Sequence, residues 1–316
     1  MSAFGDNCPL VLSPRQLLDI PSNEVAILDA SWHMPNSPRN ARKEFLQKRL
    51  PKARYLDLDE VASPHELGLM HMMPDGEVFA KACESLGISP SSHVVLYDTH
   101  GVFSSPRALF MFRAFGHHRS SILDGGLPHW EAHGCPTESG EPQPVARGKY
   151  PPLSLDTSVI RDYQQMISNA NYSPDDPAAQ IVLDARPRGR YLGTDPEPRP
   201  NLPSGHIPHS FSLPFSLFLK TNTYKSTGHS EPISYTTLRP TSEILEELRA
   251  TLGDQRLQEI IEGKRGVVTS CGSGMTAGIL WLGLKLLGVE KVQLYDESWT
   301  GYASRSESPI VKGEHD

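Results

Sequence analysis

Residues 267–282 read VVTSCGSGMTAGILWL. A short apolar run ends at Cys271, a loop of small residues follows, and a second apolar run begins at Ala277. This order predicts a buried strand, a turn and a helix. The backbone N–H groups of a Gly/Ser loop can form an anion cradle, to which the helix adds the positive end of its dipole. Because both effects favour the thiolate, the pattern predicts a nucleophile rather than a buried structural cysteine.

The first half of the chain repeats the order of the second half. In each half the sequence predicts a strand that ends in Asp-Ala and then a turn that contains proline. A second strand follows, with a loop of small residues and a helix that ends at a glycine. A third strand comes last, followed by a turn with a tryptophan. In the first half these features are 25–30, 50–53, 94–98, the helix 106–115 before Gly116, 121–124 and Trp130; in the second half they are 181–185, 207–210, 267–271, the helix to Leu287 before Gly288, 292–296 and Trp299.

Strands that alternate with helices predict an α/β fold in which each half is a parallel sheet flanked by helices. Sites in such sheets form at the carboxyl ends of the strands, where Cys271 is predicted to lie. Its counterpart in the first half is Asp98, which cannot act as a sulfur nucleophile. We therefore expect an inactive N-terminal domain over residues 10–135, a proline-rich linker over 136–155 and a catalytic C-terminal domain over 156–308.

Length and charge narrow the class of protein. A chain of 316 residues fits two domains, and a formal net charge of -7 argues against bulk electrostatic binding to nucleic acid or to an anionic membrane. Four dispersed cysteines without a C-x-x-C pair fit a reducing compartment and disfavour a zinc site. The first 14 residues contain no Lys or Arg, so we expect no secretory signal. The predicted location is the cytoplasm, with the mitochondrion as the alternative.

A cysteine phosphatase on a related fold would need an arginine six residues after the cysteine to hold the phosphate oxygens. That position is Ala277, and residues 272–276 contain neither Arg nor Lys. The loop therefore disfavours a phosphate dianion. A neutral loop suits a substrate whose charge lies away from the atom that the cysteine attacks.

The tandem pattern, the CGSGMTA loop and residues 189–199 (GRYLGTDPEPR) resemble the rhodanese superfamily, and within it the 3-mercaptopyruvate sulfurtransferases. Residues 204–208 (SGHIP), 113–118 (RAFGHH) and 123–127 (LDGGL) strengthen the resemblance, which covers residues 12–304. The likeness is greatest to eukaryotic members, fungal ones among them. It implies two tandem rhodanese-like domains, each a parallel sheet flanked by helices.

The resemblance also implies a set of site residues. Cys271 is the nucleophile, and Gly272, Gly274, Met275 and Thr276 form the substrate-binding loop. Arg190 and Arg199 match the family's two substrate arginines, and an arginine can bind a carboxylate in bidentate fashion. By contrast, we expect Arg186 and Arg188 to be solvated surface arginines, and Trp32 and Trp299 to be core residues.

Proton transfer is assigned to a second group of residues by the same resemblance. Ser273 corresponds to the family's catalytic serine, with His71 and Asp59 as its partners. The interval between the Asp and the His is one residue longer here, which leaves His65 as a rival to His71. A Ser–His–Asp relay can move a proton off the donor thiol or onto the departing enolate.

These residues predict a sulfurtransferase that moves the sulfur of 3-mercaptopyruvate through a Cys271 persulfide and releases pyruvate. The expected acceptor is thioredoxin or a sulfur-carrier protein, and no metal or organic cofactor is expected. Three alternatives remain: a sulfur-relay protein for tRNA thiolation, a thiosulfate:cyanide sulfurtransferase, and a catalytically silent binding module. We expect no direct binding to nucleic acid or to a membrane.

Overall fold

The computed structural model describes residues 8–225 and 231–314, so the first seven residues of the N-terminal segment lie outside the described residues. The chain divides into two compact units. Unit 1 comprises Met1–Ser63, Met73–Leu155 and Leu219–Leu238. Unit 2 comprises Pro64–Met72, Asp156–Phe218 and Arg239–Asp316. Each unit therefore contains a short piece of sequence from the other half of the chain.

Unit 1 is built on a five-stranded, all-parallel sheet with the strand order β1-β5-β4-β2-β3. The central strand β4 is fully buried, as expected of a strand covered on both faces. The strands are β1 (Val11–Leu12), β2 (Val25–Asp29), β3 (Arg54–Tyr55), β4 (His93–Tyr97) and β5 (Ser120–Leu123).

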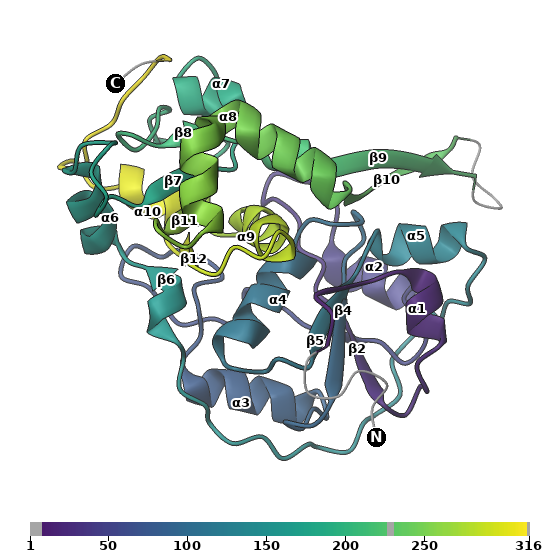
Figure 1. Ribbon diagram of the computed structural model, residues 1–316. Coiled ribbons are helices and arrows are strands. Elements are labelled where there is room, and N and C mark those ends of the chain that lie inside the picture. Colours follow the sequence, from purple (N-terminus) through teal and green to yellow (C-terminus); the bar gives the residue numbers. More distant parts are fainter. Residues whose placement is uncertain (1–7, 226–230, 315–316) are drawn as a thin grey trace. The chain divides into compact units, whose positions relative to one another are not determined.

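Helices cover both faces of this sheet. Figure 1 shows α1 (Pro14–Leu18), α2 (Ala41–Gln47) and α5 (Gly126–Ala132) on one side of the strands, and α3 (Gly76–Ser85) and α4 (Ser105–Ala114) on the other. The first face holds a core in which Val95, Tyr97 and Leu123 of the sheet pack against Phe45 and Trp130. Burial of side chains of this size contributes roughly 1.5–3 kcal/mol each.

Unit 2 repeats the architecture with the strand order β6-β12-β11-β7-β8, again all parallel. Taken in chain order, its five strands occupy the same positions as the five strands of unit 1. They are β6 (Ile160–Arg161), β7 (Ile181–Asp184), β8 (Phe211–Ser212), β11 (Val267–Ser270) and β12 (Val292–Tyr295). The predicted fold of two tandem α/β domains is confirmed.

Helices also flank the sheet of unit 2. One core unites α6 (Tyr163–Ala170) and α10 (Ser298–Ala303) with the strands, and α9 (Ala277–Leu286) contacts β11 and β12. Helix α8 (Thr241–Ile261) contacts α9 and is kinked at Gly253, whose φ is 76°. The remaining elements are α7 (Arg188–Leu192) and the 3₁₀ turns η1 (Thr157–Val159) and η2 (Phe215–Phe218).

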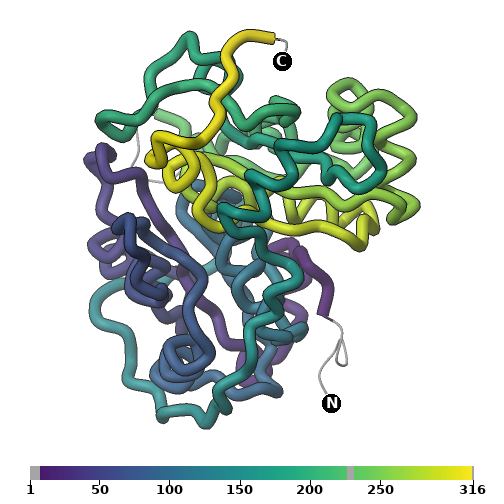
Figure 2. The backbone as a smooth tube through the Cα atoms, turned by 90° about the vertical axis from the view of Figure 1, so that its left-hand side faces the viewer, coloured from purple at the N-terminus to yellow at the C-terminus, as the bar shows by residue number. Residues whose placement is uncertain are grey.

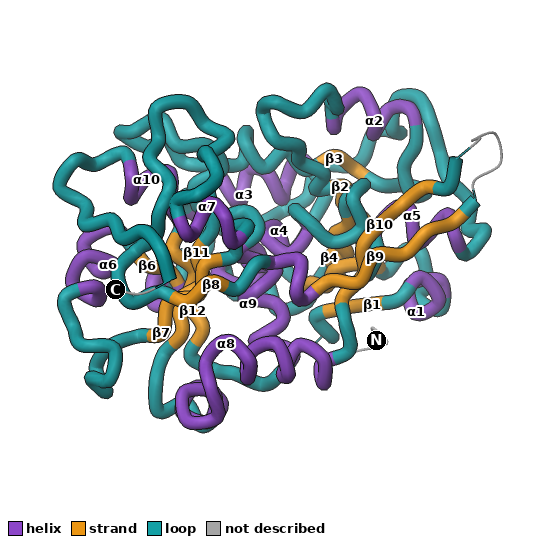
Figure 3. The backbone as a smooth tube through the Cα atoms, turned by 90° about the horizontal axis from the view of Figure 1, so that it is seen from above, coloured by secondary structure: helices purple, strands orange, loops and turns teal. Residues whose placement is uncertain are grey.

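An antiparallel hairpin formed by β9 (Leu219–Tyr224) and β10 (Ile233–Leu238) belongs to unit 1, although it lies in the second half of the sequence. Its two strands run side by side in Figure 3. The Leu238 N–H donates to the carboxylate of Asp124 at 2.9 Å, and the Thr236 N–H donates to the carbonyl of His100 at 3.1 Å. The hairpin therefore closes over the loop that follows β4.

Small features of the backbone confirm the internal repeat. The two proline-containing turns place Lys52 and His209 in the left-handed region, with φ of 62° and 61°. Both turns close with a hydrogen bond of 3.1 Å, from Ala53 to Leu50 and from Ser210 to Ile207. The predicted helix stops are also present, because Gly116 and Gly288 follow α4 and α9 with φ of 73° and 80°. The predicted turns around Trp130 and Trp299 are instead the short helices α5 and α10.

Residues 136–155 contain no helix and no named strand, and they group with unit 1 (Figure 2). Glu138 forms an isolated bridge with Arg49, and Gly148 donates to the carbonyl of Glu84 at 2.8 Å. This proline-rich stretch is therefore packed along unit 1. Within the described ranges, no helix combines the length and apolar character needed to cross a lipid bilayer.

Candidate active site

Cys271 lies directly after the carboxyl end of β11 and is 2% exposed. Its main-chain N–H donates to the Ser298 hydroxyl at 3.1 Å, and its carbonyl accepts the Trp299 N–H at 2.9 Å. The start of α10 therefore fixes the backbone of the cysteine from both sides.

Ser298 adopts a φ of 51°. This left-handed backbone conformation is unfavourable for a residue that has a β-carbon. Its hydroxyl accepts from Cys271 and donates to the carbonyl of Tyr295 at 2.9 Å. At the corresponding place in unit 1, Gly126 has a φ of 53°, and the Leu127 N–H donates to the Asp98 carbonyl at 3.1 Å. The structure thus pairs Ser298 with Gly126 and Trp299 with Leu127, whereas the sequence comparison matched Trp299 with Trp130.

The loop after Cys271 leaves backbone donors unused. Within the described ranges, the N–H groups of Gly272, Ser273, Met275 and Thr276 make no hydrogen bond. Gly274, the middle of the loop, has a φ of 81°, which favours glycine. Such a row of main-chain donors next to a thiol can stabilise a thiolate or a persulfide anion.

Unit 1 shows how the matching loop binds a negative group. The buried carboxylate of Asp98 accepts six hydrogen bonds at 2.8–3.0 Å: five from main-chain N–H groups and one from a hydroxyl. Its own side chain therefore fills the cradle of unit 1. The donors are the N–H groups of His100, Gly101, Phe103, Ser104 and Ser105 and the Ser105 hydroxyl.

Both predicted substrate arginines approach this loop. A β-carbon built on Gly272 would lie 3.2 Å from Nη2 of Arg190 and 3.4 Å from Nη1 of Arg199. Two guanidinium groups therefore lie against Gly272, the residue that follows the cysteine. Arg190 is carried by α7, which begins four residues after β7 ends. The geometry permits these arginines to bind an anionic part of a substrate beside Cys271.

The expectation that Arg186 is a solvated surface residue is wrong. Arg186 is 1% exposed, its Nη1 lies 2.8 Å from Oε1 of Glu197, and its Nη2 lies 2.6 Å from Oδ2 of Asp184. The guanidinium lies 4.1 Å from the ring centroid of Trp299. Although burial opposes it, the pKa of Arg186 is raised because the two carboxylates favour its charged form. Arg188 is exposed as expected and pairs with Glu314.

His71 lies in the segment that groups with unit 2 and is 2% exposed. Its Nε2 is 2.8 Å from the main-chain carbonyl oxygen of Ser273, so this nitrogen carries the proton and donates it. The structure therefore brings His71 to the loop, but to the carbonyl of Ser273 rather than to its hydroxyl. His71 has a φ of 46°, a strained backbone conformation of the kind that is often found at functional sites.

The rival histidine His65 lies near a carboxylate, and the predicted aspartate Asp59 accepts a hydrogen bond from a tryptophan. His65 lies 3.7 Å from a carboxylate oxygen of Glu297, which also pairs with Arg305. Asp59 belongs to unit 1, where its Oδ2 accepts the indole N–H of Trp32 at 3.0 Å. Both tryptophans predicted to be core residues are buried, Trp32 at 7% exposure and Trp299 at 1%.

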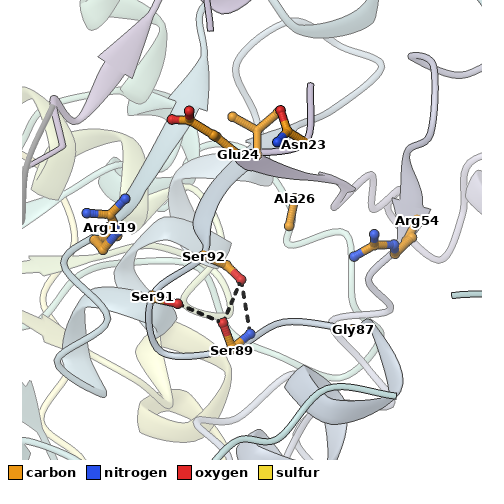
Figure 4. Close-up of a pocket in the computed structure, with 10 residues that line it drawn as sticks. Asn23, Glu24, Ala26, Arg54, Gly87, Ser89, Ser91, Ser92 and Arg119 are labelled. Atoms are coloured by element: carbon orange, nitrogen blue, oxygen red, sulfur yellow. Dashed lines mark hydrogen bonds between the residues drawn. The ribbon is translucent and has the colours of Figure 1, made fainter. Parts of the chain in front are cut away.

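Within the part of the chain that the structure describes, no three His, Cys, Asp or Glu side chains gather in a way that could hold a metal ion. A cavity of about 590 Å³ in unit 1 lies elsewhere, near the first residues of β2 and the turn before β4 (Figure 4). There Arg54 and Arg119 flank a turn with Ser89 and Ser92. None of the predicted site residues lines this cavity, which lies at the opposite end of the strands from Asp98.

Comparisons with known proteins agree with the repeat. The sequence matches the rhodanese-like domain family over residues 13–133 and again over 161–305. It is 35% identical over 285 residues to the probable 3-mercaptopyruvate sulfurtransferase of Schizosaccharomyces pombe, covering 90% of this chain and 88% of that protein. It is also 35% identical over 302 residues to the mitochondrial thiosulfate/3-mercaptopyruvate sulfurtransferase 1 of Arabidopsis thaliana, covering 91% and 74%. The crystal structure of Tum1 from Saccharomyces cerevisiae superposes with a TM-score of 0.80 at 26% identity, covering 98% of this chain and 100% of that chain.

Proposed function

Because the chain belongs to the sulfurtransferase family with tandem rhodanese domains, we propose that it transfers the sulfur of 3-mercaptopyruvate to an acceptor thiol through a persulfide on Cys271. The observation that carries this choice of donor is the arrangement around Gly272. Two arginine side chains lie beside it, whereas residues 272–276 are uncharged. The site therefore offers positive charge beside the cysteine and a neutral cradle around it.

This division of charge fits 3-mercaptopyruvate. Its carboxylate and its thiol lie at opposite ends of the molecule, so Arg190 and Arg199 can hold the carboxylate while the sulfur faces Cys271. The same guanidinium groups can reach the neighbouring carbonyl oxygen, on which negative charge develops as the carbon–sulfur bond breaks. The Arabidopsis relative's name includes thiosulfate, so a second donor is part of the test.

In the first step, the Cys271 thiolate attacks the sulfur atom of 3-mercaptopyruvate. A sulfur–sulfur bond forms, the carbon–sulfur bond breaks, and its electron pair leaves with pyruvate as the enolate. The enolate takes up one proton and becomes pyruvate. Cys271 keeps the transferred sulfur as a persulfide, a covalent intermediate that divides one difficult step into two. Unused N–H groups of the loop can stabilise its negative charge.

Ser273, His71 and Asp59 are the proposed route for that proton. The contact between His71 and the Ser273 carbonyl supports a role for His71 at this loop. The second half-reaction needs only an acceptor thiolate, which attacks the outer sulfur and returns Cys271 to its thiolate form. Thioredoxin or a sulfur-carrier protein is the proposed acceptor, and a cytoplasmic or mitochondrial site of action is proposed with it. The chemistry uses no metal or organic cofactor.

The decisive experiment measures pyruvate release from 3-mercaptopyruvate in the presence of a thiol. We expect release by the wild type and none by Cys271→Ser. Cys135→Ser is the matched control, because Cys135 is also a free cysteine and is partly exposed. Mass spectrometry of the intact protein after donor treatment should show one added sulfur atom on the wild type and on Cys135→Ser. Pyruvate release by Cys271→Ser would contradict the proposal.

A further inference from the structure

A buried carboxylate joins the arginine beside Cys271 to the interior of unit 2. The Glu197 side chain is 1% exposed. Its Oε2 accepts from Nη2 of Arg190, and its Oε1 accepts from Nη1 of Arg186 at 2.8 Å. Glu197 thus bridges one arginine that lies against Gly272 and one that is enclosed by protein. Sequence reasoning treated Glu197 only as part of a family motif.

The inner arginine is a rigid support. The Arg186 Nε lies 3.0 Å from Oδ2 of Asp184, and its Nη2 donates to the Gly205 carbonyl at 2.6 Å. The ring of Trp299 covers its face. Asp184 ends β7 and Trp299 lies in α10, so these two elements of unit 2 hold Arg186 in place. Arg186 in turn fixes the position of Glu197.

The outer arginine depends on this support. The Arg190 side chain is 17% exposed, and its Nε makes no hydrogen bond with the residues that the structure describes. Among the described residues, Glu197 is the hydrogen-bond partner of this guanidinium group, and that contact sets the orientation of the planar fork. The same nitrogen, Nη2, is the one that approaches Gly272.

The bridge also balances charge. Two guanidinium groups, Arg186 and Arg190, are matched by two carboxylates, Asp184 and Glu197. The positive charge of Arg190 is therefore partly neutralised by Glu197 before any anion binds. Such a site favours a singly charged carboxylate over a dianion, because the second negative charge would be repelled by the buried Glu197.

We propose that Glu197 is a positioning residue that orients Arg190 and biases Cys271 towards singly charged sulfur donors over dianionic ones. This inference rests on the proposed function, because it assumes that Arg190 contacts the donor. It extends that function by assigning donor selectivity to a residue behind the site that is too deeply buried to contact the donor itself.

The test compares kcat/KM for 3-mercaptopyruvate, a monoanion, with kcat/KM for thiosulfate, a dianion, in the wild type and in Glu197→Gln. Gln keeps the shape of the side chain and removes its charge, while Asp184 still pairs with Arg186. We expect the ratio of the two kcat/KM values to shift by about tenfold towards thiosulfate. The KM for thiosulfate should fall because Glu197 no longer repels the dianion, and the KM for 3-mercaptopyruvate should rise because Arg190 is held less firmly. Glu197→Asp keeps the charge and should keep most of the wild-type ratio.

The matched control is Glu314→Gln, because Glu314 pairs with the exposed Arg188 on the same helix, α7. It should leave the ratio unchanged. Equal losses with both donors in Glu197→Gln, together with a lower melting temperature, would show a merely structural role and overturn the inference. A wild type that forms a persulfide with neither donor would instead contradict the proposed function. A wild type that uses both, with an unchanged ratio in Glu197→Gln, would contradict this inference alone.

Discussion

The main-chain nitrogen of Cys271 and the hydroxyl oxygen of Ser298 lie 3.1 Å apart, and the serine that makes this contact is held at a φ of 51°. Replacing Ser298 with Ala removes two buried hydrogen bonds and keeps the strained backbone. We expect Ser298→Ala to lower the free energy of unfolding by about 1–3 kcal/mol and to slow sulfur transfer. Urea denaturation and pyruvate release check both effects.

The variant Ser298→Gly separates the cost of the strained backbone from the loss of the hydroxyl's hydrogen bonds. Glycine adopts this φ without cost, so it should recover roughly 1 kcal/mol relative to Ser298→Ala. It cannot accept the Cys271 N–H, and its activity should therefore stay as low as that of the alanine variant. Wild-type activity in Ser298→Gly would show that the hydroxyl is dispensable for the cysteine.

Truncation of either arginine beside Gly272 tests the proposed carboxylate clamp. We expect Arg190→Ala and Arg199→Ala each to raise the KM for 3-mercaptopyruvate by about 10- to 100-fold, because a charge-assisted hydrogen bond is lost. The effect on thiosulfate should be smaller. Arg188→Ala, on the exposed side of α7, is the control and should match the wild type. Equal losses with both donors would argue against the clamp.

The choice between two histidines follows from their contacts. His71 reaches the Ser273 carbonyl, whereas His65 pairs with Glu297. We expect His71→Asn to lower kcat by about 100-fold or more if this imidazole moves the proton, since Asn tolerates the left-handed backbone of this position. His65→Asn should retain kcat. The reverse outcome in steady-state kinetics would assign the role to His65.

Removing the charge of Asp98 should destabilise unit 1. In Asp98→Asn, a side-chain amide would turn its own N–H groups towards donors of the loop. We expect a loss of at least about 3 kcal/mol in the free energy of unfolding. Asp75→Asn is the control, because Asp75 caps α3 by accepting the Val78 N–H and Asn caps equally well. Comparable stabilities of the two variants in urea would contradict this account.

Asp29 predicts a pH dependence. Burial raises the pKa of Asp29 to about 7, and its Oδ2 has no hydrogen-bond partner among the described residues. The folded state therefore keeps a proton that the unfolded chain loses near pH 4. Stability from this group is present below pH 4, falls as the pH rises towards 7, and is constant above it.

Asp29→Asn should remove that dependence. We expect the variant and the wild type to unfold alike at pH 4, and the variant to be more stable at pH 8 by up to about 4 kcal/mol. The exposed Asp19→Asn is the control and should follow the wild type at both pH values. Parallel stability curves for Asp29→Asn and the wild type would refute the assignment.

The fold was predictable because it is encoded locally and twice. Apolar runs such as 181–185 and 267–271, each followed by turn residues, correspond to β7 and β11 within one residue. The edge strands have only two residues each, which is too short for an alternating pattern of apolar residues to predict them; they are β1, β3, β6 and β8. The β9–β10 hairpin also escaped prediction. Its partners in unit 1 lie roughly a hundred residues earlier in the chain, and such distant pairing leaves no local signal.

At the site, motif residues were easier to predict than their supports. Cys271, Arg190 and Arg199 were identified from sequence, and the structure gathers them around Gly272. Arg186 was misassigned because arginine is usually exposed, and only the fold shows that Asp184 and Glu197 enclose it. The catalytic roles of Ser273, His71 and Asp59 stay predictions.

The exchange of segments between the two halves bears on the order in which the protein can mature during synthesis. A ribosome delivers residues 1–155 first, but unit 1 also includes residues 219–238. We therefore expect unit 1 to remain incomplete, with the loop after β4 uncovered by the hairpin, until residues 219–238 have been synthesised. Unit 2 in turn takes residues 64–72, including His71, from the part made first. Neither half of the chain contains a complete unit, so we expect two fragments split at the midpoint to complete their folding only when both are present.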